Sequence, residues 1–155
     1  MKKIIIIGGA GYIGAVLIDY LLKRNNQIIC VDNLIYKNGF AINSFRKNKN
    51  FKFIKEDLRN KNIIKNIIKK FIDKDTDVII LAGLVGDPIT KKYNQLANSI
   101  NKIGINNLIN MLNKFNFNKL LFISTCSNYG LSKSNKLLDE KNKLNPISKY
   151  ASDKV

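Results

Sequence analysis

The chain has 155 residues, a formal net charge of +16 and no histidine, and its length fits a single domain. The lack of histidine excludes Ser-His-Asp triads, histidine-based zinc sites and imidazole acid–base catalysis, and we expect no metal site. The lysines are spread along the chain, and no stretch interleaves basic and aromatic residues as a stacking platform would. We therefore interpret the charge as a solvated basic surface and expect no nucleic-acid partner.

The sequence carries no sign of export or of a membrane segment. Its two cysteines, Cys30 and Cys126, offer no disulfide framework. No apolar segment is long enough to span a bilayer, and the short apolar run after Met1 ends in glycines, which is not typical of a secretory signal. We expect a cytoplasmic protein with no membrane partner.

The first apolar run ends in a glycine-rich turn. Four consecutive isoleucines, 4–7, predict a strand that is buried on both faces. Gly8, Gly11 and Gly14 follow at the three-residue spacing of a phosphate-binding turn. The helix that begins there would present free N–H groups to phosphates, and this pattern predicts a dinucleotide site.

Strands and helices alternate along the rest of the chain. Further strands are predicted at residues 27–31, 51–54, 78–81 and 120–123, and the strand at 78–81 is predicted to be buried. Helices are predicted over residues 13–24, 63–71 and about 91–114, and another near residue 148. This alternation predicts one Rossmann-type, doubly wound α/β domain over residues 1–155, with a parallel sheet of strand order 3-2-1-4-5.

Polar residues follow the predicted strands at the sheet edge where ligands bind in such folds. Asp32 closes the second strand near the position of a ribose-binding acid, so we expect NAD to be preferred over NADP. The alternative is that Asp32 only caps the following loop. That loop, 33–50, is longer than most connections, which favours a role in a site.

A phenol and an ammonium are spaced to share one helix face. Tyr150 and Lys154 are four residues apart, and Thr125 ends the fifth predicted strand. A phenol of pKa about 10 is a poor base, but a lysine cation and a nicotinamide cation would both favour its phenolate. Such a pair alone is typical of a solvated helix. Behind a dinucleotide turn, it favours catalysis with Thr125 orienting the same substrate oxygen.

Several motifs in order resemble one family. They are Gly8–Gly14, Asp32–Leu34, Asp57–Leu58, Leu81–Gly83, Asn101–Gly104, Ser124–Thr125 with Tyr129–Gly130, and Leu144–Ser148 before Tyr150. Along its whole length the chain resembles the N-terminal part of the NAD-dependent epimerase/dehydratase family, extended short-chain dehydrogenases/reductases that act on nucleotide sugars.

The resemblance implies NAD as cofactor and a nucleotide-sugar substrate. It implies a catalytic trio of Thr125, Tyr150 and Lys154, in which Tyr150 takes a proton from a sugar hydroxyl while hydride leaves the same carbon. The implied cofactor contacts are Gly8, Gly11, Tyr12, Ile13, Gly14, Asp32, Asn33, Asp57, Leu58, Leu81, Ala82, Gly83, Asn101, Ser124, Tyr150 and Lys154. A homodimer through the long helix and the Tyr150 helix is also implied.

Two departures narrow the expectation. Family 4,6-dehydratases carry an Asp-Glu pair after the catalytic threonine, where this chain has Cys126 and Ser127, so we expect an epimerase or dehydrogenase. Family members also continue beyond the position of Val155 with further strands and a substrate domain, which leaves two interpretations: a fragment of a longer enzyme, or a short product that binds cofactor without turning over sugar. A non-catalytic NAD(P)-binding module that senses cofactor or docks a partner is the alternative, which the complete trio disfavours.

Overall fold

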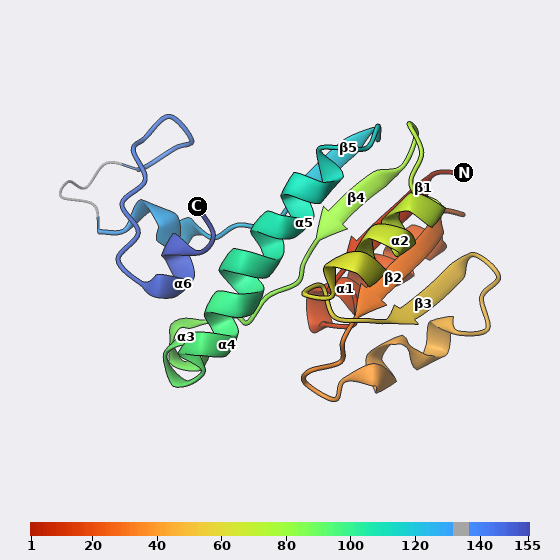
Figure 1. Ribbon diagram of the computed structural model, residues 1–155, viewed down its shortest axis with the longest axis horizontal. Helices are drawn as coiled ribbons and strands as arrows, with labels where there is room; N and C mark the ends of the chain where they lie inside the picture. Colours follow the sequence, from red (N-terminus) through yellow and green to blue (C-terminus); the bar gives the residue numbers. More distant parts are fainter. Residues whose placement is uncertain (132–136) are drawn as a thin grey trace.

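The computed structural model describes residues 1–131 and 137–155 and forms one parallel sheet (Figure 1). Its strands are Lys3–Ile7 (β1), Gln27–Asp32 (β2), Phe51–Lys55 (β3), Asp77–Ile80 (β4) and Lys119–Phe122 (β5). All four neighbouring pairs are parallel, and the order is β3-β2-β1-β4-β5. The predicted fold class and strand order are confirmed.

Helices connect the strands in sequence order. The α-helices are Tyr12–Leu22 (α1), Lys61–Phe71 (α2), Asp87–Lys92 (α3), Asn94–Ala97 (α4), Ile105–Leu112 (α5) and Lys149–Ser152 (α6). Two 3-10 helices, Gly39–Phe45 (η1) and Cys126–Tyr129 (η3), and a π-helix, Asn98–Gly104 (η2), complete the elements. Within residues 1–131 and 137–155, no helix is long and apolar enough to cross a membrane.

The prediction of one continuous helix over about residues 91–114 was wrong in its start and in its continuity. Helical structure already begins at Asp87, and Tyr93 interrupts it with φ −115° and ψ 49°. The chain then continues through α4, the π-helix η2 and α5. A π-helix takes more residues per turn than an α-helix, so the buried face changes spacing. Asn101 and Gly104 are therefore buried, whereas Ile103 is 51% exposed.

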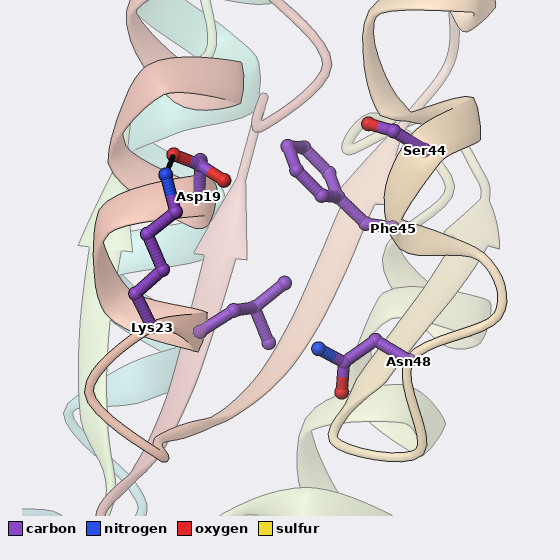
Figure 2. A pocket seen from close by; sticks show the side chains of 6 residues that line it. Asp19, Lys23, Ser44, Phe45 and Asn48 are labelled. Carbon is purple, nitrogen blue, oxygen red and sulfur yellow. Dashed lines mark hydrogen bonds and ion pairs between the residues drawn. The ribbon is translucent and has the colours of Figure 1, made fainter.

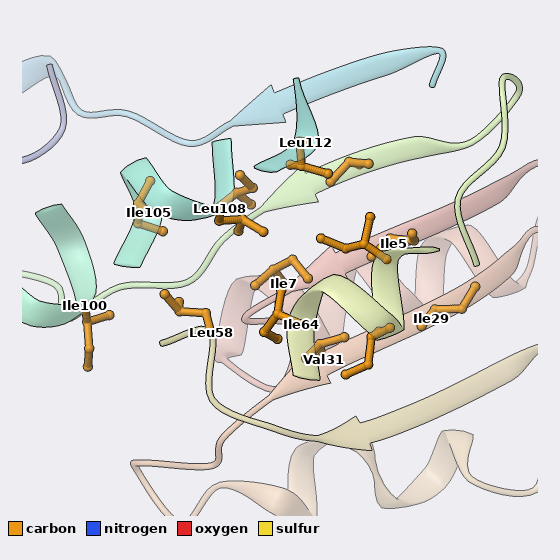
Figure 3. Packing of buried hydrophobic residues seen from close by; sticks show 14 of the residues in the cluster. Ile5, Ile7, Ile29, Val31, Leu58, Ile64, Ile100, Ile105, Leu108 and Leu112 are labelled. Atoms are coloured by element: carbon orange, nitrogen blue, oxygen red, sulfur yellow. The ribbon is translucent and has the colours of Figure 1, made fainter. Parts of the chain in front are cut away.

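The core consists of one cluster on each face of the sheet, because successive strand residues point to opposite faces. Ile5 and Ile7 of β1 pack beneath α2 and α5, as Figure 3 shows for the buried residues on that side. Ile4 and Ile6 pack on the other face against residues of α1 and η1. The central strand β1 is thus packed on both faces. This packing fixes the position of the glycine turn that follows it.

Candidate functional site

The predicted phosphate-binding turn is formed by close backbone approaches. Gly8 has φ +83°, which favours glycine, and a side-chain carbon there would collide with the backbone of Ala82 at the end of β4. A side-chain carbon at Gly14 would collide with the backbone of Gly9. Gly8 N–H also donates to Val31 O of β2 at 2.7 Å. The turn therefore brings the carboxyl ends of β1, β2 and β4 together at the start of α1.

A cavity of about 700 Å³ lies at these strand ends, within the usual range for small-molecule sites. It occupies the point where the strand order reverses on either side of β1. The lining includes predicted residues from both ends of the chain: Gly8, Gly11, Tyr12, Ile13, Gly14, Asp32, Asn33, Leu58, Leu81, Ala82, Gly83, Ser124, Tyr150 and Lys154. The structure thus brings most of the predicted site residues into one concave surface.

Asp32 both lines the cavity and holds its wall. Its carboxylate accepts hydrogen bonds from the backbone N–H of Ala10 at 3.0 Å and of Leu34 at 2.7 Å. The first bond fixes the glycine turn, and the second fixes the loop after β2. Because each carboxylate oxygen has two acceptor positions, both oxygens can still accept a bond from a ligand hydroxyl.

Three predicted residues lie outside the cavity lining, and Asp57 is one of them. Its carboxylate accepts from Arg59 Nε at 2.9 Å and Nη2 at 2.7 Å, and from Asn33 Nδ2 at 2.9 Å. The Arg59 guanidinium is the main reason that the pKa of Asp57 falls to about 2. Its neighbour Glu56, which was not predicted, lines the cavity instead.

Asn101 and Thr125 are the other two predicted residues outside the cavity lining. The side chains of both form hydrogen bonds with backbone groups. Asn101 is buried, and its side chain bonds both backbone groups of Leu84, N–H at 2.8 Å and O at 2.9 Å. It therefore fixes the loop after β4, which forms a cavity wall. Thr125 Oγ1 accepts from Ser127 N–H at 3.2 Å and caps η3. The predicted role of Thr125 toward substrate stays a prediction.

Lys154 is almost completely buried although it carries a charge. It is 7% exposed, its Nζ donates to Ile123 O at 3.1 Å, and the ammonium lies 4.7 Å from the ring centre of Phe122. Burial lowers the pKa of its ammonium. Its interactions bind it to the end of β5, and its Nζ would lie 3.6 Å from a side-chain carbon added at Gly83.

The Tyr150 phenol does not show the expected lowering of its pKa. Burial raises the pKa of Tyr150, and Tyr12, Asp87 and Cys126 raise it further because each can become negatively charged nearby. Lys154 is not among the groups that shift the pKa of Tyr150, and its ammonium donates to the Ile123 carbonyl. The chain without ligand therefore holds Tyr150 in its neutral form at neutral pH.

Polar contacts join the helix α6, which bears Tyr150, to β5. Ser124 Oγ donates to Lys154 O at 3.0 Å, and Asn128 Nδ2 donates to Ser124 Oγ at 2.7 Å. At the start of α6, Ser148 Oγ accepts from Ala151 N–H at 3.1 Å, which is an N-cap bond. The helix is thus fixed at both ends by side chains rather than by a large apolar face.

Sequence reasoning missed a group of residues that complete the cavity. They are Ile7, Val31, Ile35, Tyr36, Asn38, Glu56, Leu84, Val85, Ile89, Ile100 and Ile123. Most are apolar residues of strand ends and loops without a motif. The length of the loop after β2 was the one signal, and Ile35, Tyr36 and Asn38 come from it.

A second, smaller cavity of about 310 Å³ lies between α1 and η1 (Figure 2). Asp19 and Lys23 form an ion pair of 2.6 Å on one side, and Ser44, Phe45 and Asn48 face them from the other. This cavity contains none of the predicted site residues. The chemistry-bearing residues therefore gather in the larger cavity.

The fold and the larger cavity define a dinucleotide-binding α/β domain, and comparison with known proteins extends this class to a family. The family model described as "NAD dependent epimerase/dehydratase family" matches residues 4–155. The chain therefore belongs to this family, as the sequence motifs predicted.

Individual relatives agree with this assignment. A dTDP-D-glucose 4,6-dehydratase of Dictyostelium discoideum is 30% identical to this chain. The match covers 100% of this chain and 38% of that protein. The structure of the UDP-Glc/GlcNAc 4-epimerase of Campylobacter jejuni superposes with a TM-score of 0.89 at 28% identity, over 99% of this chain and 46% of that one.

A third relative was solved with cofactor. The dTDP-glucose 4,6-dehydratase of Bacillus anthracis, in complex with NAD, gives a TM-score of 0.81 at 27% identity, over 99% of this chain and 47% of that one. The chain thus spans less than half the length of the relatives it matches.

Proposed function

We propose that this chain is the cofactor-binding portion of an NAD-dependent nucleotide-sugar epimerase or dehydrogenase, with Tyr150 as the base. One observation carries the proposal. Tyr150 and Lys154, near one end of the sequence, line the same cavity as the glycine turn near the other end. A protein that only bound a dinucleotide would not need a phenol beside the end of β5.

The residues of the chain have distinct tasks in this proposal. Gly8, Gly11 and the start of α1 bind the phosphates, and Asp32 binds the adenosine ribose. NAD, when bound, accepts a hydride from a sugar carbon and can return it. Tyr150 takes the hydroxyl proton from the same carbon, and the positive charge of the oxidised nicotinamide would favour its phenolate, against the raised pKa of the free chain.

We infer oxidation without loss of water, with epimerisation at C4 as the leading outcome. Cys126 and Ser127 follow Thr125 and provide neither a carboxylic acid nor a carboxylate for elimination. Product analysis of the full-length protein with UDP-, GDP-, CDP- and dTDP-hexoses tests this. A 4-keto-6-deoxy sugar formed from an ordinary hexose would contradict it.

The role of Asp32 is tested by cofactor titration. A carboxylate at this position repels a 2′-phosphate, so NAD(H) should bind more tightly than NADP(H). Asp32→Asn, which keeps an acceptor but removes the charge, should narrow the preference. Equal or tighter binding of NADP(H) by the unaltered chain would assign Asp32 to loop capping alone.

The catalytic role of Tyr150 is tested by separating binding from turnover. We expect the 155-residue chain to bind NAD(H) and to turn over no nucleotide sugar, and the full-length protein to do both. Tyr150→Phe in the full-length protein should abolish turnover and leave NAD(H) binding within about threefold. A full-length protein that binds NAD but acts on no nucleotide sugar would support the non-catalytic module instead.

We also propose a homodimer in which the η2–α5 segment and the α6 helix face a second copy. An exposed isoleucine, Ile103, on η2 supports this surface. Light scattering of the full-length protein should give a dimer mass, and Ile103→Lys should shift it to the monomer. A monomeric mass for the unaltered protein at micromolar concentration would rule the dimer out.

A further inference from the structure

The ammonium of Lys154 lies where the ends of β4 and β5 meet. Its Nζ donates to Ile123 O, the first carbonyl after β5, at 3.1 Å, and lies 4.7 Å from the ring centre of Phe122, the last residue of β5. After the end of β4, a side-chain carbon added at Gly83 would be 3.6 Å from the same Nζ. The ends of two strands therefore surround a cation that comes from the segment after α6.

The groups that hold this ammonium are electrically neutral. Its hydrogen-bond acceptor is a backbone carbonyl, and the ring of Phe122 carries no charge. Asp153, the adjacent acid in the sequence, pairs with Lys149 Nζ at 3.3 Å. A carbonyl and an aromatic ring attract a cation without cancelling its net charge. A protonated Lys154 therefore presents its full positive charge to the cavity that it lines.

Titratable side chains on the surrounding elements do not set the state of Lys154. They are Lys149, Tyr150 and Asp153 on α6 and its end, Asp87, Lys91 and Lys92 on α3, Cys126 and Tyr129 on η3, and Lys119 on β5. Burial is the one cause that lowers the pKa of Lys154 among the described residues. The neutral contacts at the end of β5 are thus what opposes the cost of burying its charge.

The contact with Phe122 differs from other contacts between lysines and rings in the described residues. Lys52 and Lys70 lie 5.4 Å and 5.6 Å from the ring centre of Phe71, and both lysines are exposed. Lys154 lies closer to its ring and is 7% exposed. The attraction between a cation and a ring grows when the cation is removed from water. We therefore expect a larger contribution from Phe122 than from Phe71.

The contact also leaves hydrogen-bonding capacity for a ligand. A lysine ammonium has three N–H donors, and one of them is directed to Ile123 O. The ring attracts the charge as a whole and does not require a directed hydrogen bond. The other donors can therefore bind acceptors of a molecule in the cavity, such as the hydroxyl groups of a dinucleotide.

We propose that Phe122 is a positioning residue for Lys154: its ring holds the ammonium at the end of β5, keeps it charged and leaves its free N–H donors for a ligand in the cavity. The effect on cofactor rests on the proposed function. The inference deepens that function by giving a role to a side chain that is not part of the cavity lining.

NMR titration of the free 155-residue chain tests the proposal. The acid dissociation constant of the Lys154 ammonium is measured from its side-chain carbon shifts, which are assigned with Lys154→Arg. The variants are Phe122→Leu, Phe122→Met, which keeps more of the side-chain length, and Phe122→Tyr, which keeps the ring. Phe117→Leu is the matched control, because Phe117 and Phe122 are both partly buried against the same core cluster. Circular dichroism melting of each variant verifies the fold.

We expect the dissociation constant of the ammonium to rise about tenfold in Phe122→Leu and Phe122→Met, because the charged form loses the attraction of the ring. Phe122→Tyr and Phe117→Leu should stay within twofold of the unaltered chain. A rise of less than threefold in the folded Leu and Met variants would overturn the proposal. So would an equal rise in Phe117→Leu, since it would assign the effect to general loosening of the core.

Cofactor binding provides a second measurement. The affinity for NAD should fall as the pH rises through the pKa of Lys154, and in Phe122→Leu this fall should begin about one pH unit lower, which corresponds to the tenfold change. Lys154→Arg stays charged, so it should lack the part of the fall that Lys154 causes. The same pH dependence in Phe122→Leu and in the unaltered chain would contradict the positioning role.

The two measurements separate this proposal from the proposed function. An unaltered chain that binds no NAD would remove the proposed function, while the titration of the free chain would still decide the role of Phe122. Unchanged titration in the Phe122 variants with normal NAD binding would overturn the role of Phe122 and leave the proposed function in place.

Discussion

Two strands that border the cavity differ sharply in how they are held. Four of the five residues of β1 are buried, whereas three of the four residues of β5 are exposed. β1 is paired on both sides and packed on both faces, but β5 pairs only with β4 in the described sheet. The half of the site that we propose to bind the nucleotide (the nucleotide-binding half) therefore rests on the apolar core. The half with the proposed catalytic residues Tyr150 and Lys154 (the catalytic half) rests on polar contacts.

The two halves of the site therefore differ in how firmly their residues are positioned. The position of the glycine turn is set by β1. A ligand phosphate there would contact backbone groups that cannot shift without disturbing the core. Tyr150 and Lys154 are positioned by Ser124, Asn128 and a four-residue helix. We expect the first half to be rigid in the free chain and the second half to depend on what packs against it.

The largest effect should come from breaking the turn itself. Gly8→Val places a β-branched side chain at φ +83° against the Ala82 backbone, and we expect the chain not to fold. Gly11→Ala is the matched control, since its new carbon would lie 3.9 Å from Gly8 O, an ordinary contact. It should melt within a few degrees of the unaltered chain but bind NAD more weakly. A folded Gly8→Val protein would contradict the account of the turn.

A pair of truncations compares the two strands directly. Ile6→Ala removes a fully buried side chain from β1 and should lower the free energy of unfolding by about 2–5 kcal/mol. Leu121→Ala removes a side chain of β5 that is 51% exposed, so the loss should stay below about 1 kcal/mol. Urea titration of both variants measures the difference. Equal losses would show that β5 is packed as firmly as β1.

A smaller, local effect should follow from removing a cap in the catalytic half. Ser148→Ala deletes the N-cap bond of α6, worth about 1 kcal/mol. Amide exchange at Ala151 and Ser152 should accelerate about fivefold, while amides of β1 stay unchanged. Ser44→Ala, beside the second cavity, is the control and should alter neither. Uniform acceleration in both regions would argue against independent halves.

The smallest effect concerns acid stability in the nucleotide-binding half. Because the pKa of Asp57 is lowered to about 2 in the fold, its stabilising contribution is present above its unfolded pKa, near 4. This contribution is lost as the pH falls from about 5 to about 2. Asp57→Asn and Arg59→Gln should each flatten this part of the stability profile. An unchanged profile in both variants would remove the Arg59 pairing as its cause.

The parts of the structure that follow from local patterns could be predicted from the sequence. Short apolar runs specify the strands, and Gly8 and Gly14 specify the turn, because each property depends on a few adjacent residues. The lining by Ile35, Tyr36 and Val85 could not be predicted, since it depends on where two loops meet across β1. No residue pattern records that juxtaposition.

Two predicted details failed or changed for a similar reason. The segment Asn98–Gly104 forms the π-helix η2, in which Asn101 and Gly104 are buried, whereas its apolar spacing favours a regular α-helix. The expected lowering of the pKa of Tyr150 depends on two cations, Lys154 and the oxidised nicotinamide of a bound cofactor. In the fold without ligand, burial of the phenol raises its pKa, and the Lys154 ammonium donates to a backbone carbonyl. Helical spacing alone shows which residues share a face, but not which bonds they already make.

The π-helix has a consequence for how this protein can change over evolution. Its wide turn holds one residue more than an α-helix needs, and Asn101 reaches Leu84 from within it. Substitutions of exposed residues such as Lys102 leave that residue count unchanged. Deletion of Lys102 would let the segment close as an α-helix and rotate Asn101 away from the cavity wall. We therefore expect this segment to tolerate substitutions but not a one-residue deletion. Its length should vary less over evolution than its composition.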